Sequence, residues 1–251
     1  MNQGSVLTSL RGHLAYLTFS HPAGNSLPSN LLNRLVENIN RLSQNTETRV
    51  IILQSEGKGA FCGGASFNEL TAIENFEQGK SFFSGFARVI NAMRKCKKTI
   101  LGRVQGKAVG GGVGLIAATD YCFATEKASI KLSELSIGIG PFVIEPAVSR
   151  KIGVAAMNKL TYDATEWHTA YWAQNHGLYA RVFDKISEMD DYVTDLAEKL
   201  AIYNPEALYK IKAISWKNTE HWDKLLEERA EISGKLVLSD FTKTALQKFR
   251  R

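Results

Sequence analysis

The stretch GKAVGGGVGLIAATD, residues 106–120, places three consecutive glycines before a short apolar segment that carries no charge until Asp120. Glycine adopts backbone conformations that other residues avoid, and it lets another group approach the main chain closely. The strand-like segment TILGRVQ, residues 99–105, precedes this run. A second glycine-rich loop, GKGAFCGGAS at 57–66, follows another apolar segment, RVIILQSE at 49–56. We therefore expect backbone amides from both loops to face one ligand.

The composition is that of a globular domain. The chain has 251 residues, of which 44% are apolar and 22% charged, enough for a sizeable core. No apolar run reaches the roughly 18 residues of a membrane helix, and the first residues lack a signal-peptide pattern. The three cysteines, Cys62, Cys96 and Cys122, show no metal-ligand spacing. We expect reduced thiols, a cytoplasmic location, no metal site, and a packing role for Cys62 in preference to a nucleophilic one.

The formal net charge of +6 and the isoelectric point of about 9.1 favour anionic partners. Basic residues gather at 94–98 and at 243–251. No nucleic-acid-binding module accompanies them, so we expect no nucleic-acid partner. A solvated surface and contacts to the phosphates of a small anionic ligand both remain open explanations.

The order of apolar patterns predicts an α/β fold. A strand hairpin is expected over residues 6–20, an amphipathic helix from Ser29, a strand at 49–56, and a second helix around residues 82–93. Single strands alternating with helices favour a largely parallel sheet, whose ligands lie at the carboxyl ends of the strands. From about Val154 the pattern becomes helical, which predicts an all-helical C-terminal third.

The glycine run admits three explanations. A dinucleotide site would use Gly110 and Gly112, but Leu115 stands where the third small residue belongs, and Glu134 would be the ribose-binding acid. Alternatively, the glycines only allow a helix to pack tightly on a sheet. The third explanation uses both loops: an amide near Gly111, at a helix start, and one from the 57–66 loop converge on one carbonyl oxygen. Such a pair stabilises an oxyanion and suits enolate chemistry.

Three segments carry a family resemblance. GKGAFCGGASFNEL (57–70), KKTILGRVQGKAVGGGVGLIAATDYCFATEKASIKLSELSIGIGP (97–141) and NHGLYARVF (175–183) resemble, in order, motifs of the crotonase (enoyl-CoA hydratase/isomerase) superfamily. The similarity spans about residues 10–185, and the chain is identified as a member of that superfamily. The segment GPFVIEPAVSRKIG (140–153) is more similar to methylglutaconyl-CoA hydratase-like bacterial members, which suggests a branched or otherwise unusual acyl group.

The resemblance implies a crotonase-type spiral of strand-strand-helix turns with a C-terminal all-helical oligomerisation region. Residues 1–190 would form the core that binds acyl-CoA, and residues 191–251 a helical trimerisation region. Family members assemble as trimers, which often pair into hexamers, and act in fatty acid metabolism. The coenzyme A would arrive as part of the substrate, without another cofactor, and the basic C-terminal segment would reach a neighbour's CoA phosphates.

The same resemblance implies particular site residues. The oxyanion donors would be the amides of Gly63 and Gly111. Backbone near Ala65 and the loop around Asn25 would hold the adenine. The full set of residues expected to bind the acyl-CoA is Ala23, Asn25, Gly64, Ala65, Phe67 and Gly110.

The acids set this chain apart from the family's hydratases. Those enzymes use two glutamates, and the corresponding positions here are Gly114 and Glu134. A single carboxylate beside an enolate can move a proton between two carbons, which is double-bond isomerisation, and burial would raise its pKa. Glu145 is a possible second acid, although helix capping or a salt bridge with Arg150 is the plainer interpretation.

We therefore expect an enoyl-CoA hydratase/isomerase family enzyme that uses Glu134 as acid and base. Adding Glu at position 114 would be expected to raise hydratase activity if the pocket holds the carboxylate. The alternatives are a catalytically impaired homologue that binds acyl-CoA or RNA, and a nicotinamide-dependent oxidoreductase. Hydration, isomerisation, decarboxylation and thioester hydrolysis remain open because they share one oxyanion trap.

Overall fold

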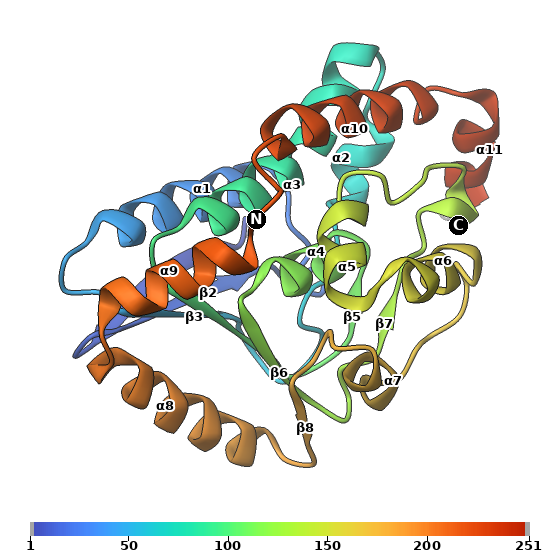
Figure 1. Cartoon of the computed structure of the whole chain (residues 1–251). Coiled ribbons are helices and arrows are strands. Elements are labelled where there is room, and N and C mark those ends of the chain that lie inside the picture. The colour runs from blue at the N-terminus through green and yellow to red at the C-terminus, as the bar shows by residue number, and fades with distance from the viewer. Residues whose placement is uncertain (1–2, 249–251) are drawn as a thin grey trace.

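A six-stranded sheet forms the centre of the computed structural model, which describes residues 3–248 (Figure 1). The strand order is β1-β2-β3-β4-β6-β8, in which only β1 and β2 run antiparallel. The strands are β1 (Ser5–Arg11), β2 (Leu14–Ser20), β3 (Val50–Ser55), β4 (Thr99–Val104), β6 (Tyr121–Thr125) and β8 (Arg181–Phe183). The predicted hairpin and the predicted parallel α/β arrangement are both confirmed.

Helices cover both faces of this sheet. On β2, Ala15 and Leu17 join the core formed with α1 (Ser29–Gln44) and α3 (Phe76–Lys95). Leu14 faces the other way and packs in a separate cluster with residues of α8 (Ile186–Ile202). Because side chains alternate between the faces of a strand, β2, β3, β4 and β6 each contribute to both layers.

A second, two-stranded sheet holds the two glycine-rich loops together. It pairs β5 (Ala108–Val109) with β7 (Ile130–Lys131), and α4 (Gly111–Ala118) begins directly after β5. The Val109 N–H donates to the Cys62 carbonyl at 2.9 Å, so the 57–66 loop lies against β5. This loop continues into the short helix α2 (Phe67–Thr71), whose N-cap is the Ser66 hydroxyl. The expectation that the two loops meet is confirmed.

The C-terminal part is mainly helical, with one exception. Its helices are α5 (Glu145–Ile152), α6 (Val154–Tyr162), α7 (Ala170–Asn175), α8, α9 (Pro205–Ser215), α10 (Trp222–Leu236) and α11 (Asp240–Lys248). Strand β8 interrupts them, so the prediction of an all-helical third is wrong at residues 181–183. The predicted domain boundary between residues 190 and 191 falls within α8, which packs on the sheet.

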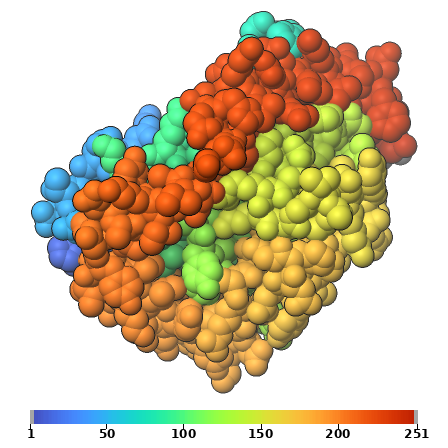
Figure 2. All heavy atoms as spheres, in the orientation of Figure 1, coloured from blue at the N-terminus to red at the C-terminus, as the bar shows by residue number. Residues whose placement is uncertain are grey.

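Helices α3 and α10 approach each other closely through glycine. A Cβ added at Gly79 of α3 would lie 2.9 Å from the Gly234 carbonyl oxygen, and one added at Gly234 would lie 2.7 Å from the Lys80 nitrogen. An ion pair between Lys80 and Glu231, 2.8 Å apart, flanks this crossing. The chain after α9 therefore returns over α3, and α10 and α11 form a ridge along one side of the molecule (Figure 2).

Replacing Gly234 by Val should lower the free energy of unfolding by about 1–3 kcal/mol, because the added carbons overpack a main-chain contact. Gly59→Val is the matched control, since a Cβ at Gly59 meets no atom within 4 Å. Equilibrium unfolding in denaturant measures both variants. An equal effect of the two substitutions would contradict the close crossing of α3 and α10.

Candidate active site

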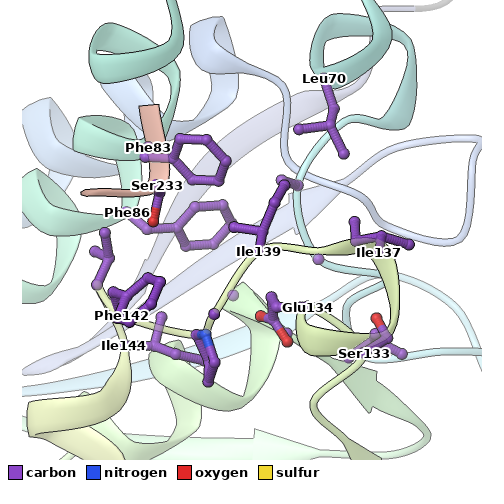
Figure 3. A pocket seen from close by; sticks show the side chains of 18 of the residues that line it. Leu70, Phe83, Phe86, Ser133, Glu134, Ile137, Ile139, Phe142, Ile144 and Ser233 are labelled. Atoms are coloured by element: carbon purple, nitrogen blue, oxygen red, sulfur yellow. The ribbon is translucent and has the colours of Figure 1, made fainter. Parts of the chain in front are cut away.

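A cavity of about 200 Å³ lies where the two glycine-rich loops meet (Figure 3). Helix α3 and the segment 137–144 form much of its wall, and α10 contributes Ser233. The lining is largely apolar, and its polar side chains are Ser133, Glu134 and Ser233. Gly63, Gly64, Ala65, Phe67, Gly110 and Gly111, which the sequence predicted at the site, all line this cavity.

Each glycine of the GGG run makes room for a different neighbour. A Cβ at Gly110, where φ is +52°, would lie 2.6 Å from the Glu134 Oε1 atom. A Cβ at Gly111 would collide with the Phe86 ring, and one at Gly112 would lie 2.7 Å from the Cys62 Cβ. The run therefore lacks side chains because a carboxyl group, an aromatic ring and a neighbouring loop occupy the space.

Glu134 precedes a 3₁₀ turn, Leu135–Ile137, and its carboxyl group points toward the cavity (Figure 3). Burial raises the pKa of this carboxyl from its usual 4.5 to about 7, because the charged form loses its hydration. The Oε2 atom is buried and has no hydrogen-bond partner among residues 3–248. Near neutral pH the group can therefore both release and accept a proton.

The amides of the two loops differ in their availability. The Gly63 N–H donates to the Gly24 carbonyl at 3.0 Å, and the Gly64 N–H to the Cys62 Sγ at 3.4 Å. Within the described residues, the N–H groups of Ala65 and Gly111 have no acceptor. The donor expected at Gly63 is thus already used, and Ala65 supplies the unpaired amide of that loop.

Asn25 and Ala23, predicted to contact the ligand, do not line the cavity. The Asn25 side chain donates to the carbonyls of Glu56 and Ala60, at 3.0 and 2.9 Å, and accepts from the His21 N–H. The Ala23 N–H lies 3.2 Å from His21 Nδ1. These hydrogen bonds fix the 21–26 loop against the 57–66 loop, so the Asn25 side chain has a structural role that its sequence context did not reveal.

The position of the missing acid is filled. A Cβ at Gly114 would lie 2.7 Å from the Ile144 Cβ, and Ile144 lines the cavity. Glu145, the candidate second acid, does not line it. Its carboxylate accepts from the Ser149 hydroxyl at 2.7 Å and lies 3.9 Å from Arg229, which is its ion-pair partner in place of the expected Arg150.

Cys62 is a second reactive group near the glycine-rich loops. Burial raises the pKa of the Cys62 thiol to about 12, so this cysteine is a packing residue. Among the lining residues that the structure describes, Glu134 is the only side chain that ionises near neutral pH. No three His, Cys, Asp or Glu residues in the described part of the chain are grouped to hold a metal ion. The arrangement combines one proton-exchanging acid with two unpaired amides.

The cavity walls contain residues that the sequence analysis did not single out as site residues. Four phenylalanines besides the expected Phe67 line the cavity, namely Phe82, Phe83, Phe86 and Phe142. The helical spacing of Phe82 and Phe86 gave a signal for a buried face, but not for a ligand cavity. Ile144 had no such signal.

Comparisons with known proteins show the family of this chain. The family profile described as enoyl-CoA hydratase/isomerase matches residues 10–249. A peroxisomal Delta(3,5)-Delta(2,4)-dienoyl-CoA isomerase of Arabidopsis thaliana is 29% identical, over 72% of this chain and 69% of the relative. A probable enoyl-CoA hydratase of Bacillus subtilis is 26% identical, over 94% of this chain and 92% of the relative.

The mitochondrial methylglutaconyl-CoA hydratase of Rattus norvegicus is 30% identical, over 73% of this chain and 59% of the relative. Among solved structures, an enoyl-CoA hydratase from Bacillus halodurans superposes with a TM-score of 0.89 at 21% identity, covering 97% of this chain and 99% of the other. That likeness shows the fold. The profile match spans nearly the whole chain, and the protein therefore belongs to the enoyl-CoA hydratase/isomerase family, whose crotonase-type motifs its glycine loops resemble.

Proposed function

We propose that this protein moves a proton between two carbons of an unsaturated acyl-CoA thioester and so shifts its double bond. The observation that carries the proposal is the Glu134 carboxyl, which lies next to Gly110 in a largely apolar cavity and whose Oε2 atom is buried without a hydrogen-bond partner among the described residues. Its pKa of about 7 suits both halves of a proton transfer at neutral pH.

The reaction needs only one carboxylate. Glu134 removes a proton from the carbon next to the thioester carbonyl, and the electron pair moves onto the thioester oxygen and the adjacent double bond. The protonated Glu134 then gives the same proton to the far carbon of the former double bond. No water is consumed, and the enzyme returns to its starting ionisation state.

The unpaired amides of Ala65 and Gly111 are the donors that we assign to the thioester oxygen. Both residues line the cavity, and Gly111 is the first residue of α4, where backbone N–H groups lack partners within the helix. A Cβ at Gly64 would lie 3.9 Å from the Gly111 nitrogen, so only a glycine-sized gap separates the loops. Fixed donors of this kind typically contribute about 3–4 kcal/mol each to transition-state stabilisation.

Isomerisation is favoured over hydration because hydration needs a second group to orient the water. The position expected for that group is Gly114, and the Ile144 side chain occupies the space beside it. The Arabidopsis relative is named as an isomerase, whereas the Bacillus subtilis and rat relatives are named as hydratases, so the names do not decide between the two reactions. The choice therefore rests on Ile144 and on the single acid.

We also infer a homotrimer or a dimer of trimers, without a further cofactor. Ile202, Ile211 and Ile214 of α8 and α9 are 82%, 61% and 73% exposed, which supports contact with a second copy of the chain. The proposed phosphate contacts of residues 243–251 fall partly on residues 249–251, outside the described residues. No helix within residues 3–248 has the length and apolar character to cross a bilayer, and the cytoplasmic location remains a proposal.

Replacing Glu134 by Gln should lower kcat for conversion of 3-hexenoyl-CoA to 2-hexenoyl-CoA by about 10²–10⁴-fold, because the amide cannot exchange the proton. The absorbance of the conjugated product measures the rate. Glu145→Gln is the matched control and should retain wild-type turnover, since Glu145 pairs with Ser149 and Arg229 outside the cavity. Unchanged turnover in Glu134→Gln would remove Glu134 from the mechanism.

The pH dependence should follow the raised pKa of Glu134. Below about pH 7 the carboxyl is protonated and cannot remove the first proton, so kcat/KM should fall about tenfold per pH unit. The folded state holds this proton more tightly than the unfolded state. The associated stability is therefore present below pH 4.5 and is lost as pH rises through about 7.

That loss is worth about 3 kcal/mol, since each pKa unit corresponds to about 1.4 kcal/mol. Denaturant unfolding of the wild type and Glu134→Gln should therefore converge at acidic pH and diverge at pH 8, where the variant is relatively more stable. A wild-type rate profile that is flat between pH 5 and pH 8 would contradict the assigned pKa.

A glutamate at position 114 should act in hydration only if the side chain of residue 144 leaves space for it. Gly114→Glu alone should lower stability without producing hydratase activity, because its side chain meets Ile144. The double variant Gly114→Glu with Ile144→Ala should hydrate 2-hexenoyl-CoA faster than Ile144→Ala alone, by about tenfold or more. Equal hydration rates for Gly114→Glu and for Gly114→Glu with Ile144→Ala would show that Ile144 does not block an acid at position 114.

A further inference from the structure

The segment 139–144 forms one wall of the cavity and contributes Ile139, Phe142 and Ile144 (Figure 3). The Phe142 ring takes the space beside Gly140, where a Cβ would lie 2.5 Å from the ring. Ile144 takes the space beside Gly114 in the same way. Each of these two apolar side chains therefore occupies space that the lack of a side chain on a glycine leaves open.

Helix α3 supplies a second apolar wall. Phe82, Phe83 and Phe86 line the cavity, and the Phe86 ring fills the space beside Gly111. The rings of Phe82 and Phe83 meet edge to face, with centroids 5.1 Å apart. Fixed rings on one wall and branched aliphatic groups on the other suit a planar or branched hydrocarbon group.

The lining excludes a second charge. Among the described residues, it contains no Lys, Arg or His, and its single acid is Glu134. A carboxylate at the far end of an acyl group would lose its hydration here without gaining a cation or an ion pair. It would also oppose ionisation of Glu134, because like charges in one site disfavour each other.

The size of the cavity sets how much of an acyl group it can enclose. An apolar cavity of about 150 Å³ accepts benzene, so about 200 Å³ accepts a group of roughly six to eight carbon atoms. Resting on the proposed function, we propose that segment 139–144 makes this site selective for acyl-CoA esters whose acyl group is a compact, uncharged hydrocarbon of that size. Dicarboxylic acyl groups would bind more weakly, because the described residues that line the cavity include no cation.

Binding of two unreactive esters of equal chain length tests the selectivity. Calorimetry with hexanoyl-CoA and adipoyl-CoA should show adipoyl-CoA binding at least about tenfold more weakly to the wild type, because only its acyl group ends in a carboxylate. Phe142→Lys should reduce this ratio by adding a cation to the wall. Tyr162→Lys is the control, since Tyr162 lies on α6 and is 76% exposed, and it should keep the wild-type ratio.

Equal affinity of the wild type for the two esters would overturn the inference, even if Phe142→Lys failed to fold. The measurement needs no turnover, so it is separable from the proposed function. Selectivity for hexanoyl-CoA without any Glu134-dependent conversion of 3-hexenoyl-CoA would overturn the proposed function and leave the selectivity standing. Glu134-dependent conversion together with equal binding of the two esters would support the proposed function and overturn the selectivity.

Discussion

The hydrogen bond from the Val109 N–H to the Cys62 carbonyl joins two glycine-rich loops that are far apart in the sequence, and the site depends on that junction. Both loops must bring main chain against main chain, which side chains would prevent. The close approach leaves the N–H groups of Ala65 and Gly111 unpaired at one cavity. In the proposed reaction these two main-chain amides would be a preorganised environment for an oxyanion, because they need not reorient.

Several glycines in this protein leave space that side chains from other elements fill. The Glu134 carboxyl occupies the space beside Gly110, and the Ile144 side chain occupies the space beside Gly114. The first contact holds an acid in a low-polarity site, where its charged form is disfavoured and its pKa rises. The second removes the room for another acid. Among the described lining residues, Glu134 is therefore the one acid.

The C-terminal helices pack against the rest of the chain, and α10 contributes to the cavity. Helix α8 packs on the face of the sheet opposite α1 and α3, and α10 crosses α3 through the contact of Gly79 with Gly234. That crossing places Ser233 at the cavity wall. Burying the Glu134 carboxyl lowers the stability of the fold. The core that offsets this loss contains residues from both ends of the chain.

The sequence alone determined the α/β class, the hairpin and the meeting of the two glycine-rich loops, because periodicity and glycine spacing are local properties. The resemblance to the crotonase superfamily added Glu134 to the expected site, and both Glu134 and Gly111 line the cavity. The sequence did not reveal that the Gly63 N–H donates to Gly24 while the Ala65 N–H has no acceptor among residues 3–248, or that Glu145 faces Arg229. Those outcomes depend on which distant groups become neighbours. Hydrogen-bond partners, burial and the pKa of a carboxyl are set by tertiary contacts, so only the folded chain decided them.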